Sequence, residues 1–210
     1  MVKTHQTIRA GTSIVFEGLD RTGKSTQLDM LRDALDPDSV VFAHMPSGFA
    51  PFTNRVYAAL EAKDMNGVVN QAEKPSSGLA QQLAHLACHA ESMSHLVEAT
   101  QRGGLVLDRW WWSTLAYGWF GGSVEQSGLS KESFQELIGA IWHPIKPAVV
   151  FVFLEPHQLD SNNNAGVEAG YRYLLSEAPQ STVVVPNDAT DRTHEFVMAN
   201  LAERDLLVSI

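Results

Sequence analysis

The chain has 210 residues, of which 44% are hydrophobic and 19% charged, and 15 basic against 24 acidic residues give a net charge of −9. This composition excludes a largely disordered chain, and the acidic balance argues against broad, nonspecific adhesion to nucleic acid. The longest apolar run, residues 148–154, is too short to span a bilayer, and the N-terminus has no apolar signal region. The single cysteine, Cys88, excludes an internal disulfide. We therefore expect a single cytoplasmic domain.

The first predicted strand, residues 13–16, leads into a glycine-rich loop. Residues 18–25 read Gly-Leu-Asp-Arg-Thr-Gly-Lys-Ser, a full match to G-x-x-x-x-G-K-[ST]. In this pattern backbone N–H groups surround the phosphates of a nucleotide, Lys24 reaches the β- and γ-oxygens, and Ser25 ligates Mg²⁺. A leucine-spaced helix predicted from residue 25 to 35 adds the positive end of its dipole. The residues expected to bind ATP and Mg²⁺ are Gly18, Asp20, Arg21, Thr22, Gly23, Lys24, Ser25 and Thr26.

Short apolar runs and longer helical stretches alternate along the rest of the chain. In order, we expect a strand at 40–43, helices at 52–63 and 79–101, a strand at 105–107, a helix at 130–142, a strand at 148–154, a helix at 167–177, a strand at 182–185 and a helix at 191–204. The runs lack polar alternation, which is typical of strands buried on both faces. Segments 64–78 and 119–128 are predicted loops near the carboxyl edge of the sheet, where ligands bind. The pattern predicts one α/β domain, a three-layer α/β/α sandwich around a five-stranded parallel sheet.

Two blocks carry more information than the generic loop pattern. Residues 16–27 read Phe-Glu-Gly-Leu-Asp-Arg-Thr-Gly-Lys-Ser-Thr-Gln, and Asp108-Arg109-Trp110 is followed by Ser113-Thr-Leu-Ala-Tyr117. Both blocks resemble the thymidylate kinase family, whose second motif reads D-R-Y…S-S-L-A-Y. The final quarter also fits that family's adenine-side ending, with adenine against residues 187–193. The resemblance implies a P-loop NTPase fold of the nucleoside monophosphate kinase type and ATP-dependent phosphorylation of a thymidine-type deoxynucleotide.

The resemblance also implies roles for individual residues. Asp108, with Ser25, would organise Mg²⁺, and Arg109 would hold the acceptor phosphate. Asp20 would accept a hydrogen bond from the sugar 3′-hydroxyl, and Arg21 would neutralise charge on the transferring group. An arginine in that position is worth roughly 10³ to 10⁵ in rate. The residues expected to act in catalysis are Lys24, Arg21, Asp108 and Arg109.

A lid is expected at about residues 155–170. In the family, the catalytic arginine lies either in the P-loop or in the lid. Residues 148–171 contain neither Lys nor Arg, so we interpret this segment as a short, uncharged lid. Under this interpretation Arg21 alone supplies the positive charge on the donor side.

The acceptor side departs from the family pattern. His44 stands where the family has an arginine, His85 and His89 stand where it has Phe and Arg, and Gly118 replaces a glutamine. Arg55, close in sequence, is a candidate to replace the lost arginine. The residues expected to bind the acceptor are Asp20, His44, Arg55, His85, His89, Arg109, Trp110 and Tyr117.

These departures leave several interpretations open. His85 and His89 share a helix face and would read the base, only pack, or bind zinc. The acceptor would be a free thymidine-type nucleotide, which we favour, or 5-hydroxymethyluracil as nucleotide or within phage DNA, because a short lid opens the site. In DNA, Asp20 would face an esterified oxygen, at a cost of about 1 to 4 kcal/mol.

A non-kinase protein that only binds ATP is a further possibility, which the Asp108-Arg109 pair argues against. We expect no membrane contact, and family analogy suggests a homodimer.

Overall fold

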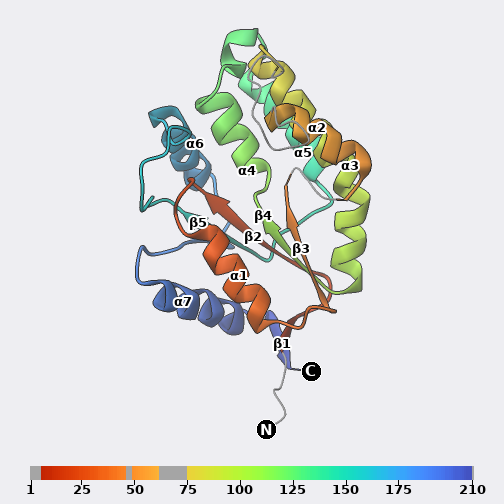
Figure 1. Cartoon of the computed structure of the whole chain (residues 1–210), viewed down its shortest axis with the longest axis vertical. Coiled ribbons are helices and arrows are strands. Elements are labelled where there is room, and N and C mark those ends of the chain that lie inside the picture. Colours follow the sequence, from red (N-terminus) through yellow and green to blue (C-terminus); the bar gives the residue numbers. More distant parts are fainter. Residues whose placement is uncertain (1–5, 46–48, 62–74, 210) are drawn as a thin grey trace.

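The computed structural model describes residues 6–45, 49–61 and 75–209. A five-stranded parallel sheet forms its centre (Figure 1). The order across the sheet is β3-β4-β2-β5-β6, which confirms the predicted parallel sheet. The strands are β2 (Thr12–Gly18), β3 (Val40–His44), β4 (Gly104–Asp108), β5 (Val149–Phe153) and β6 (Thr182–Val184).

Helices cover both faces of this sheet, as the alternation along β2 requires. Ile14 and Phe16 belong to one buried cluster and Val15 to the other, because successive side chains of a strand point to opposite faces. α1 and α7 pack on the first face and contact each other (Figure 1). α3, α5 and α6 contribute to the cluster on the second. The helices are α1 (Lys24–Ala34), α2 (Pro51–Glu61), α3 (Gly78–Arg102), α5 (Lys131–Trp142), α6 (Ala165–Ser176) and α7 (Thr190–Glu203).

Three features had no counterpart in the sequence prediction. β1 (Gln6–Ile8) pairs antiparallel with β7 (Leu207–Ser209), and strands of three residues carry too short a pattern to recognise. After the short α4 (Trp111–Ser113), a π-helix, η2 (Thr114–Phe120), includes most of the motif at residues 113–117, for which no secondary structure is predicted. A 3₁₀ turn, η3 (Val124–Ser127), lies inside the predicted loop 119–128. The predicted loop 64–78 falls almost entirely outside the described residues.

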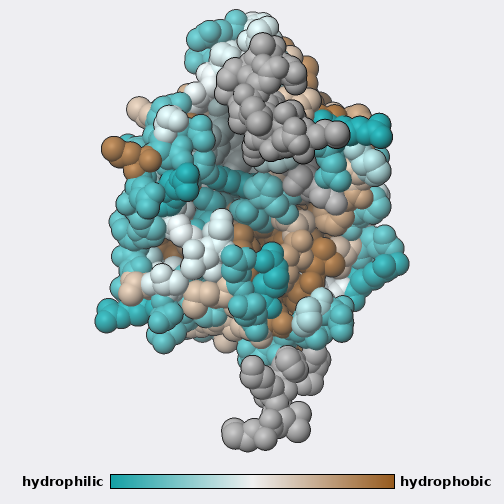
Figure 2. All heavy atoms as spheres, in the orientation of Figure 1, coloured by the Kyte–Doolittle hydropathy of each residue, from teal (hydrophilic) through white to brown (hydrophobic). Residues whose placement is uncertain are grey.

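Polar side chains dominate the viewed surface. Figure 2 shows hydrophilic residues over most of this face, with hydrophobic ones gathered beside α1, over β3. Within the described ranges, no helix combines the length and apolar character needed to cross a membrane.

Candidate active site

The glycine-rich loop joins the carboxyl end of β2 to the first turn of α1. Gly18 and Gly23 both have positive φ, 127° and 84°, which glycine adopts without strain. A Cβ on Gly18 would collide with the backbone of Phe153 on β5. Arg21 also has a positive φ, 60°, although it has a Cβ, so its backbone conformation is strained where that of the two glycines is not. The loop is therefore held in a tight turn against the neighbouring strand.

Lys24 is buried beneath this loop, with 6% of its surface exposed. Its Nζ donates to the carbonyl oxygens of Gly18 and Leu19 and to the Thr22 hydroxyl. Burial, reinforced by the charge of Arg109, lowers its pKa from 10.5 to about 7, although Asp108 and other carboxylates oppose the shift. An ammonium so poor in negative partners gains strongly from a phosphate placed beside it.

The lid segment before α6 contacts the P-loop directly. Asn163 donates to the Asp20 carbonyl at 2.8 Å and accepts from the Asp20 N–H at 2.9 Å. His157 N–H donates to the Arg21 carbonyl at 2.8 Å. The description of this lid as uncharged left out Asp160, whose carboxylate pairs with the Arg21 Nε at 3.3 Å. Arg21 thus has an acidic partner that a nucleotide phosphate would have to replace.

Arg109 lies between the P-loop and the acceptor side. It too has a positive φ, 75°, and its guanidinium donates to the Gly18 carbonyl and pairs with Asp20. Further bonds reach the hydroxyls of Ser113 and Tyr171, each at 3.2 Å. The two residues predicted to bind opposite ends of the acceptor, Asp20 and Arg109, therefore form an ion pair in this structure.

A buried carboxylate, Glu17, holds this region together and was not singled out from the sequence. It is fully buried and accepts from Gly18 N, Trp110 N, Ser113 N and Oγ, and Tyr171 OH at 2.7–3.1 Å. Ser113 and Tyr171 also contact Arg109, so Glu17 orients the groups that orient the arginine. An acidic residue directly after the apolar run at residues 14–16, inside a fully buried strand, was the signal that would have found it.

Ser25 and Asp108, both predicted to act at Mg²⁺, line the same small cavity beside the P-loop. Burial raises the pKa of Asp108, but a 2.8 Å hydrogen bond from His44 Nδ1 and the charges of His44, Arg109 and Lys24 outweigh it and hold the pKa below its usual value. A hydroxyl and an ionised carboxylate are donors that Mg²⁺ prefers, with phosphate and water completing its shell. The two side chains present therefore fit this ion.

A cavity of about 300 Å³ opens on the other side of Arg109. Seven of the eight predicted acceptor residues line it: Asp20, His44, His85, His89, Arg109, Trp110 and Tyr117. Arg55 does not, because its side chain is exposed on α2, whereas Tyr57 of that helix does. The prediction missed Met45, Tyr57, Gln82, Ser113 and Thr114. The π-helix supplies Thr114 and Tyr117, and such irregular turns often occur at functional sites.

Among the histidines that line this cavity, His89 has a strongly lowered pKa. Burial, with a contribution from His85, lowers its pKa to about 3. Its Nδ1 accepts a hydrogen bond from Trp142 Nε1 at 3.2 Å. Across the described ranges, no three His, Cys, Asp or Glu residues form a group that could hold a metal ion. The zinc interpretation of His85 and His89 thus gains no support, and the histidine pair belongs to the acceptor cavity.

Burial of neutral His89 should make the fold sensitive to mild acid. In the unfolded chain this imidazole is protonated near its ordinary pKa of 6.5, whereas in the folded protein its pKa is lowered to about 3. Stability is therefore lost as the pH falls below 6.5, by about 2 kcal/mol between pH 8 and pH 5. In urea titrations the wild type should lose about 2 kcal/mol more than His89→Gln over this range. An equal loss in both proteins would contradict neutral burial.

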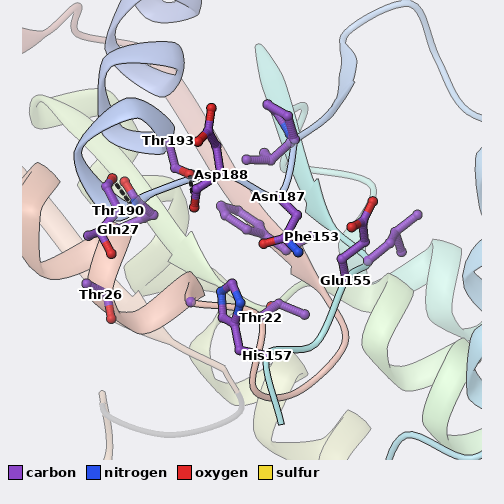
Figure 3. A pocket seen from close by; sticks show the side chains of 14 residues that line it. Thr22, Thr26, Gln27, Phe153, Glu155, His157, Asn187, Asp188, Thr190 and Thr193 are labelled. Carbon is purple, nitrogen blue, oxygen red and sulfur yellow. Dashed lines mark hydrogen bonds between the residues drawn. The ribbon is translucent and has the colours of Figure 1, made fainter.

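The opposite flank of the P-loop forms a second cavity (Figure 3). Thr22, Gly23 and Thr26 line it from the loop, and His157 projects over the same space from the lid segment. The far wall comes from the segment between β6 and α7 and from the first turn of α7, where Gln27 Nε2 donates to the Thr190 carbonyl at 2.9 Å. This wall includes the stretch predicted to face adenine, with Asn187, Asp188, Thr190 and Thr193.

The three consecutive tryptophans divide between these surroundings. Trp112 is buried in the core. Trp110 lines the acceptor cavity and packs edge-on against Trp111 at 5.2 Å between ring centroids. Packing accounts for most of this cluster, and only Trp110 lies where a base would stack.

Comparisons with known proteins indicate one family. A family model described as thymidylate kinase matches residues 16–159. The thymidylate kinase of Chlorobaculum parvum is 25% identical over 202 residues, which cover 82% of this chain and 86% of that protein. The thymidylate kinase of Desulforudis audaxviator is 27% identical over 192 residues, which cover 84% of this chain and 83% of that protein.

Solved structures share the fold. The thymidylate kinase of Ehrlichia chaffeensis superposes with a TM-score of 0.69 at 20% identity, over 91% of this chain and 98% of its own. That of Candida albicans gives 0.61 at 20% identity, over 98% and 96%.

Proposed function

Because the chain belongs to the thymidylate kinase family, we propose that it transfers the γ-phosphoryl group of ATP to thymidine 5′-monophosphate. One observation carries the proposal at the level of geometry. The cavities on the two flanks of the P-loop are lined by residues only two positions apart, Asp20 on the acceptor side and Thr22 on the other. Donor and acceptor phosphates can therefore meet over the same loop, which an in-line transfer needs.

The residues around this meeting point divide the work of transfer. Main-chain amides of the loop and Lys24 bind the donor phosphates, and Arg109 binds the acceptor phosphate. Asp20, released from Arg109 when phosphate arrives, accepts the 3′-hydroxyl of the sugar. The tertiary contacts of Glu17 with Ser113 and Tyr171 keep Arg109 aimed. No covalent enzyme intermediate is required, because positioning and charge neutralisation supply the rate.

Mg²⁺ would be held by Ser25 directly and by Asp108 directly or through water. When bound, it neutralises charge on the phosphates. Within the chain itself, the His44 hydrogen bond keeps one oxygen of Asp108 in a fixed orientation. The proposal extends to a cytoplasmic location. By family analogy it also extends to a homodimer, and light scattering on the purified protein tests this oligomeric state.

Arg21→Ala should slow turnover more than it weakens ATP binding. Residues 148–171 offer no other cation on the donor side, and such an arginine acts on charge that develops in the transition state. We expect kcat to fall by roughly 10³-fold, with the KM for ATP changed less than about tenfold. Asp160→Asn, which only removes the competing partner of Arg21, is the matched control and should not lower kcat. Unchanged turnover in Arg21→Ala would refute this role.

The acceptor is tested with labelled ATP and a panel of substrates. The panel holds dTMP, dUMP, 5-hydroxymethyl-dUMP, dCMP and DNA that contains 5-hydroxymethyluracil. The proposal expects rapid formation of dTDP and ADP, with ADP appearing only when an acceptor is present. Label that enters only the DNA would instead support the hydroxymethyl kinase, which the comparisons do not favour. Slow ATP hydrolysis without any acceptor would point to a protein that is not a kinase.

A further inference from the structure

Gln82 of α3 occupies space that Gly118 leaves empty. A Cβ on Gly118 would lie 2.6 Å from Cδ and 2.8 Å from Oε1 of Gln82. The glycine in the π-helix therefore admits the Gln82 side chain to the acceptor cavity, which it lines. Within the described part of the chain the Gln82 amide has no hydrogen-bond partner, so its donor and acceptor groups are available to a ligand.

His89 lies on the same face of α3, seven residues further along, or about 10 Å at the helical rise. Its ring is neutral, and Nδ1 is occupied as an acceptor by the indole N–H of Trp142. A neutral imidazole carries one proton, so that proton is on Nε2, which can only donate. Among the described residues nothing accepts from Nε2, although His89 lines the cavity. The Trp142 contact thus presents a hydrogen-bond donor of fixed identity.

We propose that His89 donates a hydrogen bond to O4 of the acceptor base and that Gln82 pairs with the adjoining edge of the same ring. Trp142 fixes the His89 tautomer and thereby makes this site selective for 4-keto pyrimidines. The inference rests on the proposed function and extends it to base selection. Asp20 and Arg109 hold the sugar and phosphate, and Tyr117, over which Arg109 stacks at 5.2 Å, belongs to that end. Position 4 is the ring atom opposite the glycosidic nitrogen, so it points away from the sugar and phosphate, and, among the described residues, Gln82 and His89 are the α3 side chains with free polar groups in the same cavity.

The two polar side chains differ in what they can discriminate. Thymine and uracil present an acceptor at position 4, whereas cytosine presents an amino donor. The Gln82 amide can rotate to complement either base. His89 cannot, because its Nδ1 is already bonded to Trp142, and a cytosine amino group would face the Nε2 proton. A buried donor left unpaired in this way lowers relative affinity by about 10- to 100-fold.

Trp142→Phe tests the positioning role, because it keeps an aromatic ring and removes the N–H that fixes the tautomer. In steady-state assays the ratio of kcat/KM for dTMP over dCMP should fall at least about tenfold, while the ratio for dTMP over dUMP stays unchanged, since both carry O4. Trp119→Phe is the control: Trp119 is a buried ring packed on Phe134 that does not line the cavity, and its variant should keep both ratios.

Two further measurements separate selectivity from packing. Ring ¹⁵N NMR of the free protein should show His89 protonated on Nε2 in the wild type and a mixture of tautomers in Trp142→Phe. His89→Gln, which restores a rotatable group, should accept dCMP even if Trp142→Phe folds poorly. Transfer to dTMP with an unaltered dTMP/dCMP ratio in both variants would overturn this inference and leave the proposed function standing. Absence of any transfer to dTMP by the wild type would remove both.

Discussion

Lys24→Met should abolish phosphoryl transfer without weakening the fold. Among the described residues, the ammonium bonds only to loop oxygens, so it is buried with none of their carboxylates in direct contact. Burial is its main cost and lowers the pKa to about 7. A bound triphosphate supplies the missing negative charge, and methionine cannot respond to it. We expect kcat/KM to fall by roughly 10³-fold or more, with the thermal midpoint unchanged or higher.

The same shift predicts that ATP binding takes up a proton. At pH 8 a lysine of pKa about 7 is mostly neutral, and the phosphates raise its pKa again. Binding should therefore capture close to one proton, and affinity should fall about tenfold for each pH unit above 7. Calorimetry in buffers of different ionisation enthalpy measures this uptake, and Lys24→Met should show none. Uptake that is identical in wild type and variant would contradict the assignment to Lys24.

Glu17→Ala should cost more stability than any surface substitution in this protein. The carboxylate accepts from five donors in a fully buried position. Alanine leaves the three backbone N–H groups without this acceptor, and of the two hydroxyls only one can still donate to the other. We expect the free energy of unfolding to fall by about 3–5 kcal/mol in urea titrations. Glu91→Ala, an exposed glutamate on α3, is the matched control and should change it by less than about 0.5 kcal/mol.

Glu17→Gln separates the role of this residue in stability from its role at the active site. The amide keeps the shape but replaces one acceptor by a donor, so Ser113 and Tyr171 must rearrange, and both contact Arg109. The KM for the acceptor should rise about tenfold or more while the KM for ATP changes little. If the kinetics are unaffected in a folded Glu17→Gln protein, the carboxylate stabilises the fold without positioning Arg109.

The parts of this protein that follow local patterns were predictable. Residues 18–25 predict a phosphate-binding loop because its geometry depends on eight consecutive residues, among them the glycines, the lysine and the serine. The apolar runs of β2 to β6 likewise announce buried parallel strands, and the order of strands and helices restricts the topology. Most of the acceptor cavity followed from one resemblance, because that motif places Arg109, Trp110 and Tyr117 after β4.

The functions of the remaining side chains depend on partners far away in the chain. Glu17 meets Tyr171 across 154 positions, Asp160 meets Arg21 across 139, and Trp142 meets His89 across 53. Proximity in sequence alone led to a wrong position for Arg55, which lies on the exposed side of α2 and does not line the acceptor cavity.

The sequence by itself therefore determined the fold and the phosphate loop, which rest on short-range geometry and hydrophobic periodicity. It indicated the class of reaction through the resemblance of two motifs to a known family. Only the tertiary structure decided which carboxylate is buried, which histidine is neutral and which glutamine fills the space beside Gly118. Those properties are set by desolvation and by hydrogen bonds between residues that folding brings together, and no local pattern encodes them.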